Sequence, residues 1–120
     1  MKFEHYETSL EKENDYPKLV RDDIPAVVEK LTGQKVKFRE MTDDKEYLKF
    51  MLRKVLEEAQ ELASAEDKEH IVEEAADLVE LIEAILKFSE VDAETFKKVK
   101  DEKASKRGGF KKRILMLEKV

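Results

Sequence analysis

The sequence contains no cysteine and no tryptophan, and only three glycines and two prolines among its 120 residues. Without cysteine the chain has neither disulfide bonds nor thiolate ligands, so a metal site must use oxygen or histidine. The longest apolar runs are four or five residues, whereas a helix needs roughly 20 apolar residues to span a bilayer. We therefore expect a cytoplasmic protein with no secretory signal and no membrane partner.

Charged side chains dominate what is present. The 29 acidic residues outnumber the 24 basic ones, giving a formal charge of -5, which argues against binding a nucleic-acid polymer because that function needs a cationic field. The length fits one domain, but a chain this short buries only about 65% of its unfolded surface. We therefore expect a thin core, self-association, and a loose polar N-terminal segment over residues 1–15.

Apolar periodicity and capping residues predict a mainly all-α fold, an antiparallel bundle of about four helices. Two stretches with strand character, residues 36–40 and 113–117, are expected to pair as a small two-stranded β element. Asp22 and Asp23 are predicted to cap the first helix, which Gly33 ends. Asp43 with Glu46 is predicted to cap the second helix, which ends near Ala65, and Asp67 is predicted to cap the third. Asp92 is predicted to cap the fourth, which ends near Lys106 before Gly108 and Gly109.

Two acidic motifs lie on the two central helices. Glu57, Glu58 and Glu61 form an EExxE pattern, and Glu74 and Asp77 form an ExxD pattern. Successive residues of a helix are rotated by about 100°. Glu58 and Glu61 therefore lie beside the apolar stripe of their helix, and Glu74 and Asp77 lie on the same side of the stripe of theirs. In an antiparallel pair, Glu58 is then level with Asp77 and Glu61 with Glu74. Four carboxylates are predicted to converge.

Such a group is costly unless a cation occupies it, because the carboxylates repel one another and lose hydration. The neighbours one turn away offer little fixed positive charge; they are Lys54, Ala65, His70 and Leu81. A hard divalent cation, Mg²⁺ or Mn²⁺, is the better match, and a lysine or arginine on these acids would argue against it. Glu57 faces away from the seam and is either a solvated helix residue or a base or outer-sphere ligand. The alternative for the whole group is a set of solvated surface glutamates.

A metal held by carboxylates commonly works with a phosphate substrate, which also needs cationic anchors. Lys18 and Arg21 are candidates near the N-terminus, and basic residues around the double glycine are candidates near the other end. Among the latter, Lys106 and Arg107 have an ordinary alternative, because basic side chains near a helix C-terminus complement its dipole. The sequence has no GxxxxGK[ST] or GxGxxG motif, which excludes the usual glycine-rich nucleotide folds.

The EExxE and ExxD motifs on successive helices resemble the signature of the all-α nucleoside triphosphate pyrophosphohydrolases, the superfamily of MazG and phosphoribosyl-ATP pyrophosphohydrolase. The flanking stretches 18–25 and 107–113 resemble segments of a small branch similar to phosphoribosyl-ATP pyrophosphohydrolase. The resemblance implies a hydrolase that releases a nucleoside monophosphate and pyrophosphate, and a homodimer or homotetramer. It implies a Mg²⁺ site at Glu58, Glu61, Glu74 and Asp77, catalytic residues Glu57, Glu58 and Glu61, and phosphate ligands Lys18, Arg21, Lys106 and Arg107.

Three functions remain in view at this point. The leading one is removal of non-standard or excess nucleoside triphosphates, and hydrolysis of phosphoribosyl-ATP is its rival within the same chemistry. A non-catalytic helical dimerisation module would keep the bundle and use the acids only for solubility or ion pairing.

Overall fold

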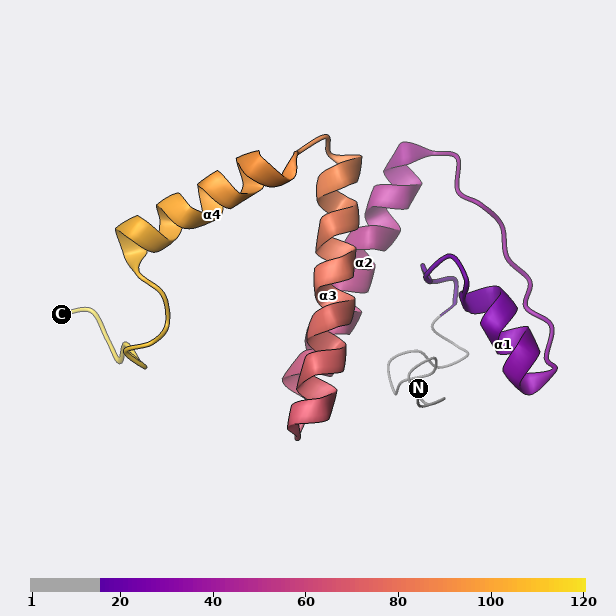
Figure 1. Ribbon diagram of the computed structural model, residues 1–120, viewed down its shortest axis with the longest axis horizontal. Coiled ribbons are helices and arrows are strands. Elements are labelled where there is room, and N and C mark those ends of the chain that lie inside the picture. The colour runs from indigo at the N-terminus through magenta and orange to yellow at the C-terminus, as the bar shows by residue number, and fades with distance from the viewer. Residues whose placement is uncertain (1–15) are drawn as a thin grey trace. The chain divides into compact units, whose positions relative to one another are not determined.

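The computed structural model describes residues 16–120, and its regular structure is entirely α-helical (Figure 1). The predicted N-terminal segment, residues 1–15, lies outside the described residues. The mainly all-α prediction is confirmed, and so is the number of helices within the described range. The helices are α1 (Ile24–Thr32), α2 (Asp44–Ala63), α3 (Lys68–Phe88) and α4 (Ala93–Arg107). None of the helices that the structure describes has the length and apolar character needed to cross a membrane.

Most of the predicted helix ends are confirmed by their hydrogen bonds. The Asp67 carboxylate accepts from the His70 backbone N–H at 2.9 Å, and the Asp92 carboxylate accepts from that of Thr95 at 2.7 Å. Gly33 ends α1 with a left-handed φ of 75°. Such a conformation suits glycine because it has no Cβ to clash.

Two capping predictions need correction. Asp23 stands at the N-cap of α1, but its side chain makes no capping hydrogen bond. Asp43 caps α2 by accepting from Lys45 N–H, whereas the Glu46 carboxylate accepts from both terminal guanidinium nitrogens of Arg39 at 2.9 Å. This bidentate hydrogen bonding lowers the pKa of Glu46 and raises that of Arg39. The glutamate therefore anchors the chain before α2 rather than closing a reciprocal capping box.

The predicted two-stranded element is wrong for the part of the chain described here. Residues 36–40 and 113–117 are irregular and carry no strand. Most of their apolar side chains stay exposed, for example Phe38 at 67% and Ile114 at 80%. Alternation of apolar residues is not enough to form a strand when no third strand or covering helix buries one face, because a two-stranded ribbon alone is marginal.

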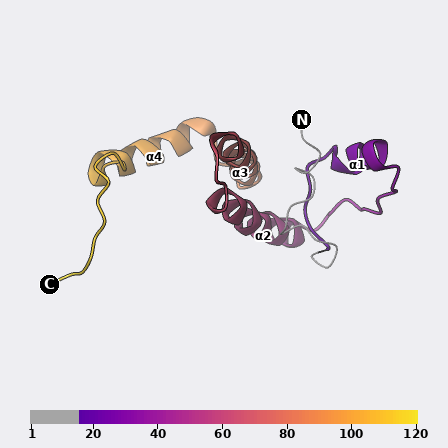
Figure 2. The ribbon, with the colours of Figure 1, turned by 90° about the horizontal axis from the view of Figure 1, so that it is seen from below.

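Helices α2 and α3 form an antiparallel hairpin joined by residues 64–67, and they lie side by side in both views (Figures 1 and 2). Its seam contains two buried apolar side chains, Met51 at 0% exposure and Leu81 at 9%. Each has a buried acid seven residues away on its own helix, Glu58 and Glu74 respectively. Residues seven apart lie on the same face of a helix, so the acids and the apolar residues share the seam.

Large apolar side chains remain exposed on both helices of this hairpin. They include Leu52, Leu56, Val72 and Val79, which are 51 to 72% exposed. Measured about each helix axis from the direction of the buried seam residues, the side chains of these four residues are rotated by roughly 100 to 160°, in the same sense on both helices. The hairpin therefore exposes an apolar surface, here called the apolar face, which consists of these four residues and extends over the outer sides of both helices, away from Asp77.

The described residues divide into two compact units, one before and one after the boundary between residues 85 and 86. The last turn of α3 begins the second unit and ends in a Schellman motif, in which Val91 N–H bonds Leu86 C=O and Glu90 N–H bonds Lys87 C=O. Glu90 occupies the left-handed position with φ of 60°. Helix α4 has no buried residue, so the second unit has little core of its own.

Candidate metal centre

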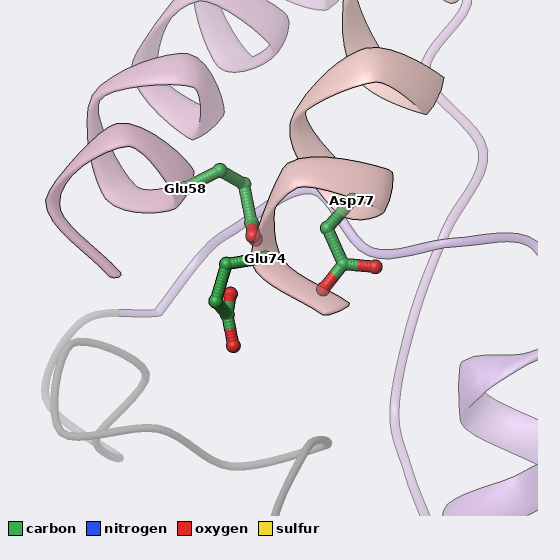
Figure 3. Close-up of side chains that lie close together, drawn as sticks. All are labelled: Glu58, Glu74 and Asp77. Atoms are coloured by element: carbon green, nitrogen blue, oxygen red, sulfur yellow. The ribbon is translucent and has the colours of Figure 1, made fainter. Parts of the chain in front are cut away.

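Three carboxylates meet at the α2–α3 hairpin. One oxygen from each of Glu58, Glu74 and Asp77 lies within 4.8 Å of the other two, and Figure 3 shows the three side chains converging from the two helices. Glu58 is 8% exposed and Glu74 is 6% exposed, while Asp77 is half-buried. Within the residues that the structure describes, this trio meets the spacing expected of a metal-binding group.

The local sequence explains how the trio forms. Glu74 and Asp77 are three residues apart on α3, so their side chains are neighbours on one helix surface. Glu58 reaches them from α2 because it occupies the seam one heptad after Met51. In the structure, the buried direction of each helix is rotated by roughly 60 to 80° from its predicted apolar stripe, toward Glu58 on α2 and toward Glu74 on α3. The two glutamates are therefore in the seam and not at its edge.

Two protein cations contact these acids, and the prediction of a pocket without protein cations is wrong. Arg21 Nη2 lies 2.6 Å from Asp77 Oδ1, and Lys54 Nζ lies 3.7 Å from Glu58 Oε1. The arginine comes from the segment before α1, 56 residues away in the sequence. The lysine is one helical turn from its partner on α2. The tertiary fold thus brings the arginine to the cluster, and helix periodicity brings the lysine. Both ion pairs count against a site reserved for metal.

The remaining acids of the EExxE motif have different positions. Glu61 is half-buried on α2 but does not belong to the described trio. The Glu57 side chain is only 14% exposed and lies 3.3 Å from Lys54 Nζ, so it is not the solvated residue that one interpretation of the sequence expected. The structure thus brings together three of the four predicted metal ligands, with Glu57 joined to them through Lys54.

The predicted phosphate-binding residues are separated along the chain. Arg21 reaches the cluster through Asp77. Lys18 Nζ lies 4.7 Å from the centre of the Tyr16 ring, an arrangement typical of a cation–π contact. Lys106 and Arg107 are exposed in the last turn of α4, where the helix dipole favours them. Their role as phosphate ligands stays a prediction.

Sequence reasoning missed Lys54 as a member of the site. Its side chain is 12% exposed and contacts both Glu57 and Glu58. Lysine and glutamate at spacings of three and four residues are neighbours on a helix, and this spacing is visible in the sequence. The spacing alone does not separate a buried contact from the many surface pairs of a chain with 44% charged residues.

Searches against protein-family models, curated proteins and solved structures find no match for this chain.

The donor set fits a hard divalent cation. Three carboxylates offer oxygen ligands alone, the type that Mg²⁺ and Mn²⁺ prefer. Two of the three are buried, and buried carboxylates that face one another are costly without positive charge between them. The six contacting side chains comprise four acids and two cations; they are Arg21, Lys54, Glu57, Glu58, Glu74 and Asp77.

Proposed function

We propose that this protein is a Mg²⁺-dependent nucleotide pyrophosphohydrolase that converts a nucleoside triphosphate to a nucleoside monophosphate and pyrophosphate. The observation that carries the proposal is the convergence of Glu58, Glu74 and Asp77 from two helices. The resemblance of the EExxE and ExxD motifs to the pyrophosphohydrolase superfamily supplies the reaction. Mn²⁺ is the alternative metal, because it accepts the same oxygen ligands.

The chain's own residues have separate tasks in this proposal. Glu58, Glu74 and Asp77 hold the metal, and Glu61 completes the set from the next turn of α2. When bound, Mg²⁺ neutralises phosphate oxygens and lowers the pKa of an attacking water. Glu57 accepts the proton of that water, as a carboxylate positioned beside the metal ligands can do.

Arg21 is proposed to bind the phosphate tail. Its guanidinium is already beside the cluster, at 2.6 Å from Asp77 Oδ1, and guanidinium matches the planar oxygen pairs of phosphate as well as those of carboxylate. Lys18 precedes it in the same segment, and Lys106 and Arg107 are further proposed ligands. Binding substrate then requires Arg21 to exchange Asp77 for phosphate.

A homodimer or homotetramer is part of the proposal. The apolar face of Leu52, Leu56, Val72 and Val79 is exposed in the single chain, and an apolar stripe on a two-helix layer is normally buried against further helices. A second hairpin would bury it and complete a four-helix arrangement. This packing leaves the acidic side of the seam open to substrate.

One observation favours a second candidate, a non-catalytic dimerisation module. Arg21 and Lys54 form ion pairs with the acids, as structural charge networks do. In such a module the carboxylates serve folding alone. The protein would then dimerise without binding metal.

The deciding experiment measures pyrophosphate release from a panel of canonical and altered nucleoside triphosphates and phosphoribosyl-ATP, with Mg²⁺ or Mn²⁺. Asp77→Asn and Glu74→Gln should lower kcat by a factor of 100 or more, on the order of what electrostatic groups contribute. Glu80→Gln, an exposed acid on the same helix, is the matched control and should keep full activity. Glu61→Gln tests the fourth ligand separately.

A thermal melt with and without millimolar metal separates the two candidates without a substrate. A ligand that binds only the native state raises its stability by mass action, so the pyrophosphohydrolase should melt at a higher temperature with Mg²⁺ or Mn²⁺. Asp77→Asn should lose this shift, and Glu80→Gln should retain it. An unchanged melting temperature together with no turnover of any substrate would favour the dimerisation module.

A further inference from the structure

Lys54 is a largely covered cation at the edge of the carboxylate cluster. Its side chain is 12% exposed, and Nζ lies 3.3 Å from Glu57 Oε2 and 3.7 Å from Glu58 Oε1. An ammonium group loses hydration when it is buried, and nearby carboxylates compensate for that loss. Because Glu58 is also a proposed metal ligand, the same carboxylate has two competing cations.

The electrostatic consequence depends on whether an anion is present. A divalent cation on Glu58 has the Lys54 ammonium as a near neighbour, and like charges in a partly buried site repel strongly. Metal binding by the protein alone is then weakened. A polyphosphate supplies negative charge that both the metal and the ammonium attract, so the same lysine strengthens binding of the metal–anion complex.

We propose that Lys54 has a conditional role at the carboxylate cluster: it weakens the binding of metal alone and strengthens the binding of metal together with a polyphosphate anion. Lys54 releases Glu58 and donates to a phosphate oxygen when the metal enters with its anion. The coupling is reciprocal, because an anion that raises the affinity for metal must itself bind more tightly when the metal is present. This inference rests on the proposed function, since it takes the cluster as the metal site.

A purely structural Lys54 predicts a different pattern. Removing a structural ion-pair partner leaves the carboxylates more negative, so affinity for the metal and for the metal–anion complex would both rise or both stay unchanged. The conditional role predicts changes of opposite sign. The sign for the complex therefore decides between the two roles.

The test consists of two titrations of the full chain. Binding of Mn²⁺ alone is measured from the electron paramagnetic resonance signal of free Mn²⁺, and binding of a preformed Mn²⁺–pyrophosphate complex is measured by calorimetry. Lys54→Met should bind Mn²⁺ alone at least about fivefold more tightly and the complex at least about fivefold more weakly, the lower end of typical coupling factors. Lys54→Arg retains the charge and should keep the wild-type pattern. Lys49→Met, an exposed lysine on the same helix, should change neither affinity.

The outcomes separate this inference from the proposed function. If the wild type binds neither Mn²⁺ nor the complex, the proposed function itself fails. If the wild type binds both and Lys54→Met shifts both affinities in the same direction or neither, the conditional role is overturned while the metal site stands. Far-UV circular dichroism checks folding, and Lys54→Gln, which keeps a polar group at that position, replaces the methionine variant if that one does not fold.

Discussion

At the residue scale, the ion pair between Arg21 and Asp77 places an arginine on one of the proposed metal ligands, so the proposed metal would compete with Arg21. The two side chains are 55% and 34% exposed, so the pair contributes no more than about 1 kcal/mol to stability. Arg21→Gln should therefore raise the affinity for Mn²⁺ roughly two- to fivefold while the melting temperature without metal stays nearly unchanged. Paramagnetic resonance titration measures the first effect. A variant that binds Mn²⁺ less tightly would contradict the competition.

Met51 should carry more of the hairpin's stability than any exposed apolar residue beside it. It is fully buried in the seam, and truncating a buried methionine to alanine costs about 2–5 kcal/mol because it removes apolar contact and leaves a cavity. Met51→Ala should lower the free energy of unfolding by that amount in urea denaturation. Leu52→Ala, at a half-exposed position next in sequence, is the control and should cost less.

At the element scale, α4 depends on exposed carboxylates whose pKa values are lowered. The backbone N–H of Thr95 lowers the pKa of Asp92, and the side chain of Lys97 lowers that of Asp101. A carboxyl with a lowered folded-state pKa stabilises the fold above its unfolded pKa, and that contribution is lost as the pH falls through the folded value. The helix content of α4 should thus decrease as the pH falls below about 3.9, the ordinary value for aspartate.

Circular dichroism across pH 7 to 2 measures this transition. Asp92→Ala removes the N-cap, so the variant should have lower helix content at pH 7 and a smaller further loss on acidification. Asp22→Ala, which changes an exposed aspartate outside α4, serves as the control. A variant with the same acid transition as the wild type would show that the cap of α4 is not responsible.

The helices were largely predictable from the sequence because their ends depend on local chemistry. Asp67 and Asp92 accept hydrogen bonds from backbone N–H groups within the first turns of their own helices, and Gly33 needs only its own left-handed conformation. The rotation of α2 and α3 about their own axes was not predictable. Both helices carry apolar residues over a wide arc, and periodicity does not show which of these residues face the other helix. Three of the predicted metal ligands meet nonetheless, since both acidic pairs lie on the same side of that arc.

The remaining errors have a common physical origin. Arg21 contacts Asp77 across 56 residues, and no local pattern encodes a contact of that range. The predicted strand at residues 36–40 has the right alternation, but pairing needs a partner and a buried face that the described chain does not supply. Helix capping and periodicity therefore predicted the helices and the acidic motifs, whereas the contacts of the acids with Arg21 and Lys54 became visible only in the structure.

At the scale of the whole molecule, the exposed apolar face predicts association through the hairpin. Leu56 is 72% exposed, and placing a charge at the centre of an apolar interface is strongly unfavourable. Leu56→Glu should convert the expected dimer into a monomer, measured by light scattering during size-exclusion chromatography. Glu80→Gln, at an exposed position on the Asp77 side of the seam, is the control and should leave the mass unchanged. A wild-type monomer at all concentrations would contradict the dimer.

Each helix of the α2–α3 seam has one buried apolar side chain and one buried glutamate, seven residues apart. A leucine at position 58 or 74 would extend the apolar seam and remove a buried charge, so the most stable hairpin is not the present one. Screening variants for thermostability alone should therefore enrich sequences that have lost these glutamates. A thermostable variant selected in that way would keep the hairpin and lose the group of three converging carboxylates.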